Sequence, residues 1–290
     1  PGATVEYRGM RHSNADPFAG IAIDGEENAC LDFRYCADPR MNWWFDHHTS
    51  GFQPPSLRAH FEADSGATKF FDPEARSCAL FIRRVLQEKF GYQPVDPEGH
   101  WDELLGWADR IDGAVFESAR EIVELASPAL QLMTWLRGNR DELLGIRILG
   151  ELGHRSLEEI VGFAWIRDDL DELMAAHRWT VELVAKNLVL EDPVVSYDLS
   201  EHEVSSHSGF IAYMLCPEAT YSIGLVRAGA MANISVGHNP WAHRPGSHNV
   251  ARLCEKYGGG GHPHVGGIAV PAGDMSRARE IVQELRVALA

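Results

Sequence analysis

An acidic residue and two histidines stand side by side in the stretch WWFDHHTSGF, residues 43–52, directly after a run of aromatic side chains. Aromatic runs of this kind are typical of buried strands, and ligands in α/β proteins bind at the ends of such strands. Asp46, His47 and His48 supply carboxylate and imidazole groups, which suit divalent metals. The triplet therefore predicts a metal site at a strand end; a surface turn with chance histidines is the alternative.

A second unusual stretch, YGGGGHPHVGG, covers residues 257–267 and has four consecutive glycines before His262. Glycine loses much conformational entropy inside a helix or strand, so we expect a loop here. Glycines also let several backbone N–H groups converge on an anion. The run therefore predicts a phosphate-binding loop, and a flexible linker is the alternative.

Length and composition limit the class of protein. The chain has 290 residues, and because single cores stop growing near roughly 250 residues we expect two domains. No apolar run approaches the ~20 residues that cross a bilayer. The N-terminal residues PGATVEYRGM show no secretory signal, so we expect a cytoplasmic location. Five cysteines without a C-x-x-C pair argue against a disulfide framework and a thiolate zinc site.

The formal net charge of −16 opposes binding to long nucleic acids, because affinity for phosphate backbones comes from clustered lysines and arginines. A short phosphorylated ligand is still compatible with this charge. Metal ions and glycine-rich loops supply local positive potential inside an acidic protein.

Two kinds of element are expected around the DHH triplet. Short strands are predicted over 3–10, 29–36 and 41–48, because each is rich in β-branched or aromatic residues and is bounded by turn residues. These strands are expected to neighbour one another in a buried sheet, with the triplet at the end of the third.

Amphipathic helices follow these strands. A helix is predicted over 72–91, with Asp72 as its cap and Gly91 at its end. Further helices are predicted over 97–114 and 168–188. The first two-thirds of the chain is therefore expected to be α/β at its start and largely helical afterwards.

Near residue 192 the helical periodicity gives way to β-branched and turn residues, and we place a domain boundary there. The remainder is expected to form a compact α+β domain. Its predicted elements after the first strand are a helix over 205–215, a strand pair over 221–237, a helix over 249–258, a strand over 267–270 and a helix over 274–289.

FDHHTS at residues 45–50 and GGGGH at residues 258–262 together resemble the two signatures of the DHH phosphoesterase family. Family members join a DHH domain to a smaller DHH-associated domain that ends in a G-G-G-H loop, and the likeness covers essentially the whole chain. The resemblance implies an α/β fold with a parallel-sheet, partly helical DHH catalytic domain over 1–191. This domain is linked to a smaller α+β substrate-binding domain over 192–290.

The resemblance also implies roles for the triplet. Asp32, at the end of a predicted strand, matches the family's acidic residue that bridges two metal ions. His47 would bind one metal, while Asp46 would orient His47 from behind. His48 would lie near the scissile phosphate, so His48 and Asp46 are the expected catalytic residues.

A further acid is expected from the helix over 97–114. Asp109, in the stretch WADRIDGA, matches the family's fourth acidic motif and would complete the shell of that metal. Asp112, one helical turn further on, is either a partner of the metal ligands or a solvated helix acid.

One family motif, H-x-x-x-D-x-D at the end of a first strand, does not stand in this sequence. The nearest match lies within residues 11–20, where His12 and Asp16 fit the spacing but Phe18 replaces the second aspartate. We therefore expect that the chain lacks the family's first strand and helix and that residues 3–10 form its second strand. The full-length protein is expected to bind two Mn²⁺ or Mg²⁺ ions, and this chain at most one well-formed metal.

The resemblance assigns substrate binding to the C-terminal domain. Backbone amides of the glycine run, with polar side chains on and after a nearby strand end, would contact a phosphate, ribose or base. These residues are Gly259, Gly260, Gly261, His262, Ser235, His238 and Asn239. For Ser235 and Asn239, turn chemistry in the sequence GHNP is the alternative.

We therefore expect a hydrolase that cleaves phosphodiester bonds of short oligonucleotides or cyclic dinucleotides, working from one end as an exonuclease. Exopolyphosphatase or pyrophosphatase activity is the first alternative; base stacking on Trp241 or Tyr257 would favour nucleotides instead. A non-catalytic nucleotide-binding protein with a degenerate metal site is the second alternative. Short phosphorylated substrates are the expected partners, without long duplexes or membranes, and the sequence leaves a homodimer open.

Overall fold

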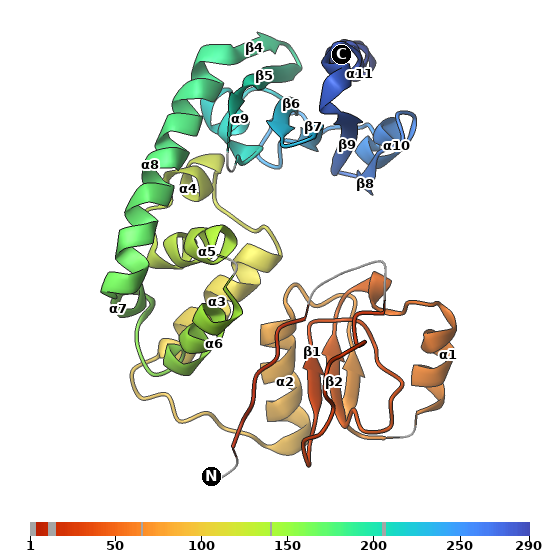
Figure 1. The fold of residues 1–290 in the computed structure, drawn as a ribbon, viewed down its shortest axis with the longest axis vertical. Coiled ribbons are helices and arrows are strands. Elements are labelled where there is room, and N and C mark those ends of the chain that lie inside the picture. The colour runs from red at the N-terminus through yellow and green to blue at the C-terminus, as the bar shows by residue number, and fades with distance from the viewer. Residues whose placement is uncertain (1–3, 11–15, 65, 140, 205–206) are drawn as a thin grey trace. The chain divides into compact units, whose positions relative to one another are not determined.

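The computed structural model describes residues 4–10, 16–64, 66–139, 141–204 and 207–290, which divide into two compact units (Figure 1). Unit 1 comprises residues 1–115 and 139–160, and unit 2 comprises residues 116–138 and 161–290. The domain boundary expected near residue 192 falls inside unit 2 and stays a prediction. No helix in the described ranges has the length and apolar character needed to span a membrane.

Unit 1 is built on a parallel sheet in the order β1-β2-β3, formed by β1 (Ala29–Leu31), β2 (Trp43–Asp46) and β3 (Lys69–Phe71). Leu31 pairs with Phe45 and Phe45 with Phe70, so the carboxyl ends of the strands meet at one edge. This confirms the predicted parallel sheet, although β1 and β2 are shorter than expected. The edge brings together the residues that follow each strand.

The helices of unit 1 are α1 (Ser56–Ala63), α2 (Cys78–Phe90), α3 (His100–Asp112) and α6 (Glu142–Glu151), with a 3-10 turn η1 (Thr49–Gly51). Because successive strand residues point to opposite faces, Trp44 packs against Phe61 of α1 and Phe45 packs against Phe81 of α2. The two helices therefore cover opposite faces of the sheet (Figure 1). Their aromatic contacts fix β2, the strand that ends in Asp46.

Helix α2 begins later than predicted. Its N-cap is Ser77, whose Oγ accepts a hydrogen bond from Leu80 N at 3.3 Å. Asp72, the expected cap, instead accepts a hydrogen bond from Glu74 N in a turn before the helix. The predicted end at Gly91 is confirmed, since Gly91 adopts φ 64° in the left-handed region that glycine favours.

Residues 4–10 form no strand, contrary to the prediction. A strand needs a neighbour that pairs with its backbone groups, and none of the described residues provides one. Val5 and Tyr7 are exposed, and the segment is held by single contacts. Arg8 donates to Ala22 O, and Gly9 N donates to Glu142 Oε1 at 2.8 Å.

Unit 2 is built on a mixed sheet in the order β4-β5-β6-β7-β9-β8. Its strands are β4 (Leu188–Glu191), β5 (Val194–Glu203), β6 (Tyr221–Ala228), β7 (Met231–His238), β8 (Gly260–His262) and β9 (Val265–Pro271). The pair β6–β7 matches the predicted strand pair, and β9 contains the strand predicted over 267–270.

The remaining elements surround this sheet. Ile223 and Ile234 share a core with Ile281 of the C-terminal helix, whereas Ser222 on the opposite face donates to Tyr213 Oη at 2.8 Å. Helices therefore cover both faces. The helices of unit 2 are α4 (Ala119–Glu124), α5 (Pro128–Gly138), α8 (Ala164–Asn187), α9 (Phe210–Leu215), α10 (Val250–Glu255) and α11 (Met275–Leu289), with a 3-10 turn η2 (Ala272–Asp274); α7 (Leu157–Val161) spans the division between the units.

Part of the glycine run is a strand, β8, and not the loop that its composition predicts. Gly261 pairs with Gly266 in an antiparallel ladder. A Cβ added to Gly259 would lie 2.2 Å from Gly267 O, and one added to Gly261 would lie 2.3 Å from Val265 O. Gly259 and Gly261 are therefore required by the close approach of neighbouring backbone, whereas a Cβ added to Gly260 would meet open space.

Candidate active site

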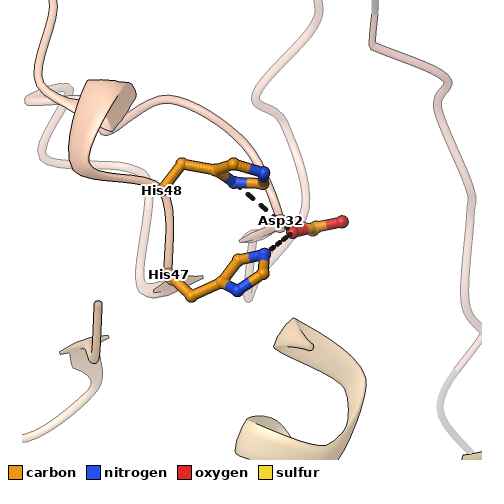
Figure 2. A group of neighbouring side chains, drawn as sticks. All are labelled: Asp32, His47 and His48. Atoms are coloured by element: carbon orange, nitrogen blue, oxygen red, sulfur yellow. Dashed lines mark ion pairs between the residues drawn. The ribbon is translucent and has the colours of Figure 1, made fainter. Parts of the chain in front are cut away.

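Asp32, His47 and His48 come together at the carboxyl edge of the parallel sheet, and both imidazole rings lie beside the Asp32 carboxylate (Figure 2). Asp32 Oδ1 is 3.4 Å from His47 Nε2 and 3.7 Å from His48 Nδ1. One ligand atom from each residue lies within 4.8 Å of the other two, and among the described residues this is the group that could hold a metal ion. The structure therefore brings together three of the residues that the family motifs indicate.

Asp32 owes its position to an unusual backbone conformation. It adopts φ 56°, in the left-handed region that costs a residue with a side chain roughly 1–2 kcal/mol. Its N–H donates to Phe45 O at 2.8 Å and holds the chain to the neighbouring strand. The turn ends β1 and leaves the carboxylate exposed at the sheet edge, and strain of this kind is concentrated at functional sites.

His47 is fixed in one tautomer by the backbone. Its Nδ1 lies 2.8 Å from Ala75 O, and because a carbonyl only accepts, Nδ1 carries the hydrogen. The lone pair of the neutral ring is then on Nε2, which is buried and has no hydrogen-bond partner in the part of the chain that the structure describes. Nε2 lies 3.4 Å from Asp32 Oδ1 and 3.4 Å from Asp112 Oδ2.

This arrangement fits a divalent cation. Neither carboxylate can donate to the His47 lone pair, so a positive charge between the three atoms satisfies all of them. Two ligand atoms about 2.1 Å from one ion lie about 3.0–3.4 Å apart at bond angles of about 90–109°. The two separations from His47 Nε2, to Asp32 Oδ1 and to Asp112 Oδ2, match this range, and oxygen with imidazole ligands suits Mn²⁺ or Mg²⁺.

The Asp46 carboxylate fixes the positions of His47 and His48 through hydrogen bonds. Its side chain is fully buried, and Oδ1 accepts hydrogen bonds from His47 N at 2.8 Å, His48 N at 3.1 Å and His48 Nδ1 at 2.8 Å. The carboxylate fits only because residue 51 is glycine, since a Cβ on Gly51 would lie 2.3 Å from Asp46 Oδ2. Asp46 is therefore placed to orient His47 and His48 through Oδ1.

His48 is half-exposed and shares its Nδ1 proton with Asp46. Burial lowers the pKa of His48, but the hydrogen bond to Asp46 and the negative charges of Asp46 and Asp32 outweigh it, so the net pKa is raised. The protonated form is therefore favoured. With Nδ1 bonded to Asp46, Nε2 is the ring atom available to donate a proton to a substrate oxygen.

Asp112 contributes the fourth group of the site from the last turn of α3. Burial raises the pKa of its carboxyl group, and the negative charge of Asp32 raises this pKa further. Repulsion between two carboxylates that flank one imidazole lone pair is relieved by a cation. The sequence did not decide whether Asp112 is a partner of the metal ligands or a solvated helix acid. In the structure its Oδ2 faces His47 Nε2 at 3.4 Å.

Asp109, the acid that the family motif indicates, is not in this group. Its Oδ2 forms an ion pair with Arg76 Nη2 at 2.8 Å, and its Oδ1 accepts a hydrogen bond from Ser77 Oγ at 3.3 Å. The side chain is buried, and its charge is already compensated by Arg76. The structure therefore presents Asp112 to His47 in the place expected for Asp109.

The weak match to the family's first motif gives no ligand in the described residues. His12 lies outside these residues. Asp16 is exposed, and its Oδ1 accepts a hydrogen bond from Phe18 N at 3.0 Å in a local turn. These two residues stay unassigned to a metal.

In unit 2, the predicted substrate residue His238 contacts two other histidines, His248 and His264. His238 Nε2 donates to His248 O at 2.8 Å, and His238 Nδ1 lies 3.3 Å from His264 Nδ1. Burial lowers the pKa of His238, although the bond to His248 O acts in the opposite direction. His262, on edge strand β8, is exposed. Imidazole groups therefore gather at this end of the second sheet.

Ser235 and Asn239 are engaged with the protein itself. Ser235 Oγ donates to Gly224 O at 3.4 Å. Asn239 is buried, its Nδ2 donates to Pro217 O and Ala219 O, and its Oδ1 accepts from Trp241 N at 3.0 Å. Asn239 therefore has the turn role that the sequence GHNP suggested as the alternative to substrate contact.

The glycines and aromatic rings that were predicted to contact substrate also take part in the fold. Gly259 N donates to Cys254 O at 3.0 Å and is not available to an anion, whereas Gly260 and Gly261 lie in edge strand β8. Trp241 Nε1 donates to Phe116 O, and Tyr257 Oη donates to Glu284. Neither aromatic ring is an isolated stacking surface.

No protein-family model and no curated protein sequence matches the chain. Among solved structures it is similar to a pGpG-specific phosphodiesterase, PggH from Vibrio cholerae, with a TM-score of 0.70 and 20% sequence identity, over 92% of this chain and 86% of that chain. An exopolyphosphatase-related protein from Bacteroides fragilis is matched with a TM-score of 0.43 and 15% identity, over 92% and 74% of the two chains.

The likeness to the phosphodiesterase shows that the chain has a DHH-type phosphoesterase fold. The two sheets and this likeness in fold also confirm the predicted α/β class, with a parallel sheet and a separate mixed sheet. The donors described above lie at the carboxyl edge of the parallel sheet, where the sequence places the DHH triplet.

Proposed function

We propose that this chain is a divalent-metal-dependent phosphoesterase that hydrolyses the phosphodiester bond of dinucleotides and other short oligonucleotides. The observation that carries the proposal is the buried lone pair of His47 Nε2, which faces carboxylate oxygens of Asp32 and Asp112 and has no hydrogen-bond partner among the described residues. Such a set of electron-pair donors favours a bound cation. Divalent cations at an open site of this kind stabilise charge on phosphate oxygens.

Each residue of the site then has a separate task. Asp32, His47 and Asp112 would hold a Mn²⁺ or Mg²⁺ ion, which supplies Lewis-acid stabilisation and a bound water of lowered pKa. Asp46 orients His47 and His48 through three hydrogen bonds. His48 holds a proton and donates it from Nε2 toward an oxygen of the substrate phosphate or of the leaving group.

The substrate class has two supports. The chain shares its fold with an enzyme whose name states that it acts on pGpG, which is a dinucleotide. The formal net charge of −16 also disfavours long polyanions. We propose that His262 and the glycine strand β8 contact such a short substrate, because His262 is exposed and β8 is an edge strand, whereas both ring nitrogens of His238 already lie against other residues.

A substrate panel tests the proposal. The Mn²⁺-loaded protein is incubated with a dinucleotide, a pentanucleotide and an RNA of about 24 nucleotides, beside pyrophosphate, short polyphosphate and a cyclic dinucleotide, each with and without chelator. We expect nucleoside monophosphates from the dinucleotide and pentanucleotide, released from one end, and little action on the long RNA. His47→Ala, which removes the metal-facing nitrogen, is expected to be inactive.

Other outcomes have definite meanings. Activity confined to polyphosphate or pyrophosphate transfers the assignment to a phosphatase of that kind. Nucleotide binding without any turnover supports a non-catalytic binding protein. Faster cleavage of the long RNA than of the dinucleotide contradicts the size preference. Use of Mn²⁺ over Mg²⁺, attack from one end, the cytoplasmic location and a homodimer stay predictions.

A further inference from the structure

Arg76 holds an unusual position beside the candidate active site. It lies in the segment between β3 and α2, and its side chain is 58% exposed, although its ion-pair partner Asp109 is buried. Arg76 Nη2 and Asp109 Oδ2 are 2.8 Å apart. The Arg76 guanidinium is therefore exposed to solvent, while the Asp109 carboxylate that fixes it is buried.

The neighbours of Arg76 tie it to the active site on one side and to α3 on the other. Ala75 O accepts the hydrogen bond that fixes His47, and Ser77 Oγ donates to Asp109. The aliphatic part of the Arg76 side chain lies against the end of α3. A Cβ added to Gly113 would lie 3.3 Å from both Cβ and Cδ of Arg76.

The ion pair also fixes how far the guanidinium is from the metal-binding residues. Asp109 and Asp112 are three residues apart on α3, so they lie on one face and are separated by about 4.5 Å along the axis at 1.5 Å per residue. Asp112 Oδ2 faces His47 Nε2 at 3.4 Å. Arg76 is therefore a cation at the rim of the site.

We propose that Arg76 binds a phosphate oxygen of the substrate and that Asp109 is the positioning residue that holds its guanidinium. This inference rests on the proposed function of the same site. A guanidinium has five N–H donors, and contact with one oxygen of Asp109 leaves others for a phosphate. Because the side chain is already held, little conformational entropy is lost when the phosphate binds.

The negative charge of the active site explains why a cation at its rim would help substrate to bind. The carboxylates of Asp32 and Asp112 repel an approaching phosphate, and a guanidinium at the rim offsets part of that repulsion. Arginine is suited to the task because its planar fork matches two phosphate oxygens at once, which a lysine ammonium does not.

A second ion pair of the same kind provides the control. Arg83 of α2 pairs with Asp102, so it is a second arginine that forms an ion pair with an acid of α3. Asp102 is in the first turn of α3 and precedes Asp112 by about 15 Å along the axis at 1.5 Å per residue. Arg83→Ala therefore removes a comparable contact at a distance from the active site.

The experiment compares the full chain with its Arg76→Ala, Arg76→Lys and Arg83→Ala variants. Inorganic phosphate and a nucleoside 5′-monophosphate are titrated into the Mn²⁺-loaded proteins by calorimetry, Mn²⁺ affinity is measured separately, and kcat and KM are determined for a dinucleotide. We expect Arg76→Ala to weaken phosphate binding and to lower kcat/KM by at least about tenfold. Arg76→Lys is expected to be intermediate, and Arg83→Ala close to the parent.

The outcomes separate this inference from the proposed function. Phosphate affinity of Arg76→Ala equal to that of Arg83→Ala, with turnover intact, overturns the role of Arg76 and leaves the phosphoesterase standing. Loss of phosphate binding in Arg76→Ala, in a protein that cleaves no phosphodiester, supports the anion site and contradicts the proposed function. If Arg76→Ala unfolds because Asp109 is left unpaired, the double variant Arg76→Ala/Asp109→Asn removes both charges and is held to the same criteria.

Discussion

The Nε2 atom of His47 lies 3.4 Å from Oδ2 of Asp112, whereas Asp109, one helical turn earlier, is paired with Arg76. Asp112→Asn is therefore expected to lower Mn²⁺ affinity by at least about tenfold, because it removes a negative ligand from the site. Asp109→Asn is expected to leave Mn²⁺ affinity close to that of the parent protein. Electron paramagnetic resonance of free Mn²⁺ measures both, and the reverse order of the two variants contradicts the assignment.

Gly51 is expected to control the position of Asp46. In Gly51→Ala the new Cβ would meet Asp46 Oδ2, so the carboxylate must shift and its bonds to His47 and His48 weaken. Overpacking of this kind costs typically about 1–3 kcal/mol. We expect a lower free energy of unfolding in urea and a lower kcat/KM in the same variant.

A matched control for Gly51 is present in α3. Gly106 has no atom within 4 Å of an added Cβ, and alanine in a helix interior is more stable than glycine by roughly 0.5–1 kcal/mol. Gly106→Ala is therefore expected to stabilise the protein with activity unchanged. Equal stability of the two alanine variants shows that Gly51 makes no room for Asp46.

Two glycines of strand β8, Gly260 and Gly261, are expected to differ in how far a side chain at that position destabilises the protein. Gly261 adopts φ 147°, and an added Cβ would meet Val265 O, so Gly261→Ala is expected to destabilise unit 2 by about 1–3 kcal/mol. Gly260 has open space, so Gly260→Val is expected to fold. If the strand binds phosphate by close backbone approach, KM rises in Gly260→Val; an unchanged KM in that folded variant removes the binding role.

The stability of unit 1 is expected to fall in alkali because of two buried thiols. Burial raises the pKa values of Cys30 and Cys78 from 9.0 to about 12. Between these pH values the unfolded chain releases protons that the folded chain retains, so stability is fully present below pH 9 and is lost as the pH rises toward 12. The free energy of unfolding, measured across this range, should fall less steeply in Cys30→Ala/Cys78→Ala; equal slopes contradict the prediction.

The sequence predicted the neighbourhood of the site better than its details. Asp32 and His47 follow adjacent parallel strands, and strand pairing alone brings such residues to one edge. Asp109 and Asp112 share one face of α3, so periodicity cannot distinguish them. The choice depends on Arg76, which reaches Asp109 from another segment. A contact of that kind is set by tertiary packing and has no local signal.

Two further differences have similar causes. Asp72 followed by proline is a good local signal for a helix start, but Asp72 forms an ion pair with Arg84 and a turn bond with Glu74, and Ser77 caps α2 instead. The glycine run has the composition of a loop, yet the close approach of β9 makes it a strand. In both cases a partner distant in sequence outweighed local propensity.

The most direct test of the metal-binding site is an anomalous difference map from crystals of this chain grown with Mn²⁺. We predict a peak bonded to His47 Nε2 and to carboxylate oxygens of Asp32 and Asp112, at about 2.0–2.2 Å from each. The peak should be absent in crystals of His47→Ala. A map without a peak at His47 at saturating Mn²⁺, or with manganese bound to Asp109 instead of Asp112, would contradict the proposed site.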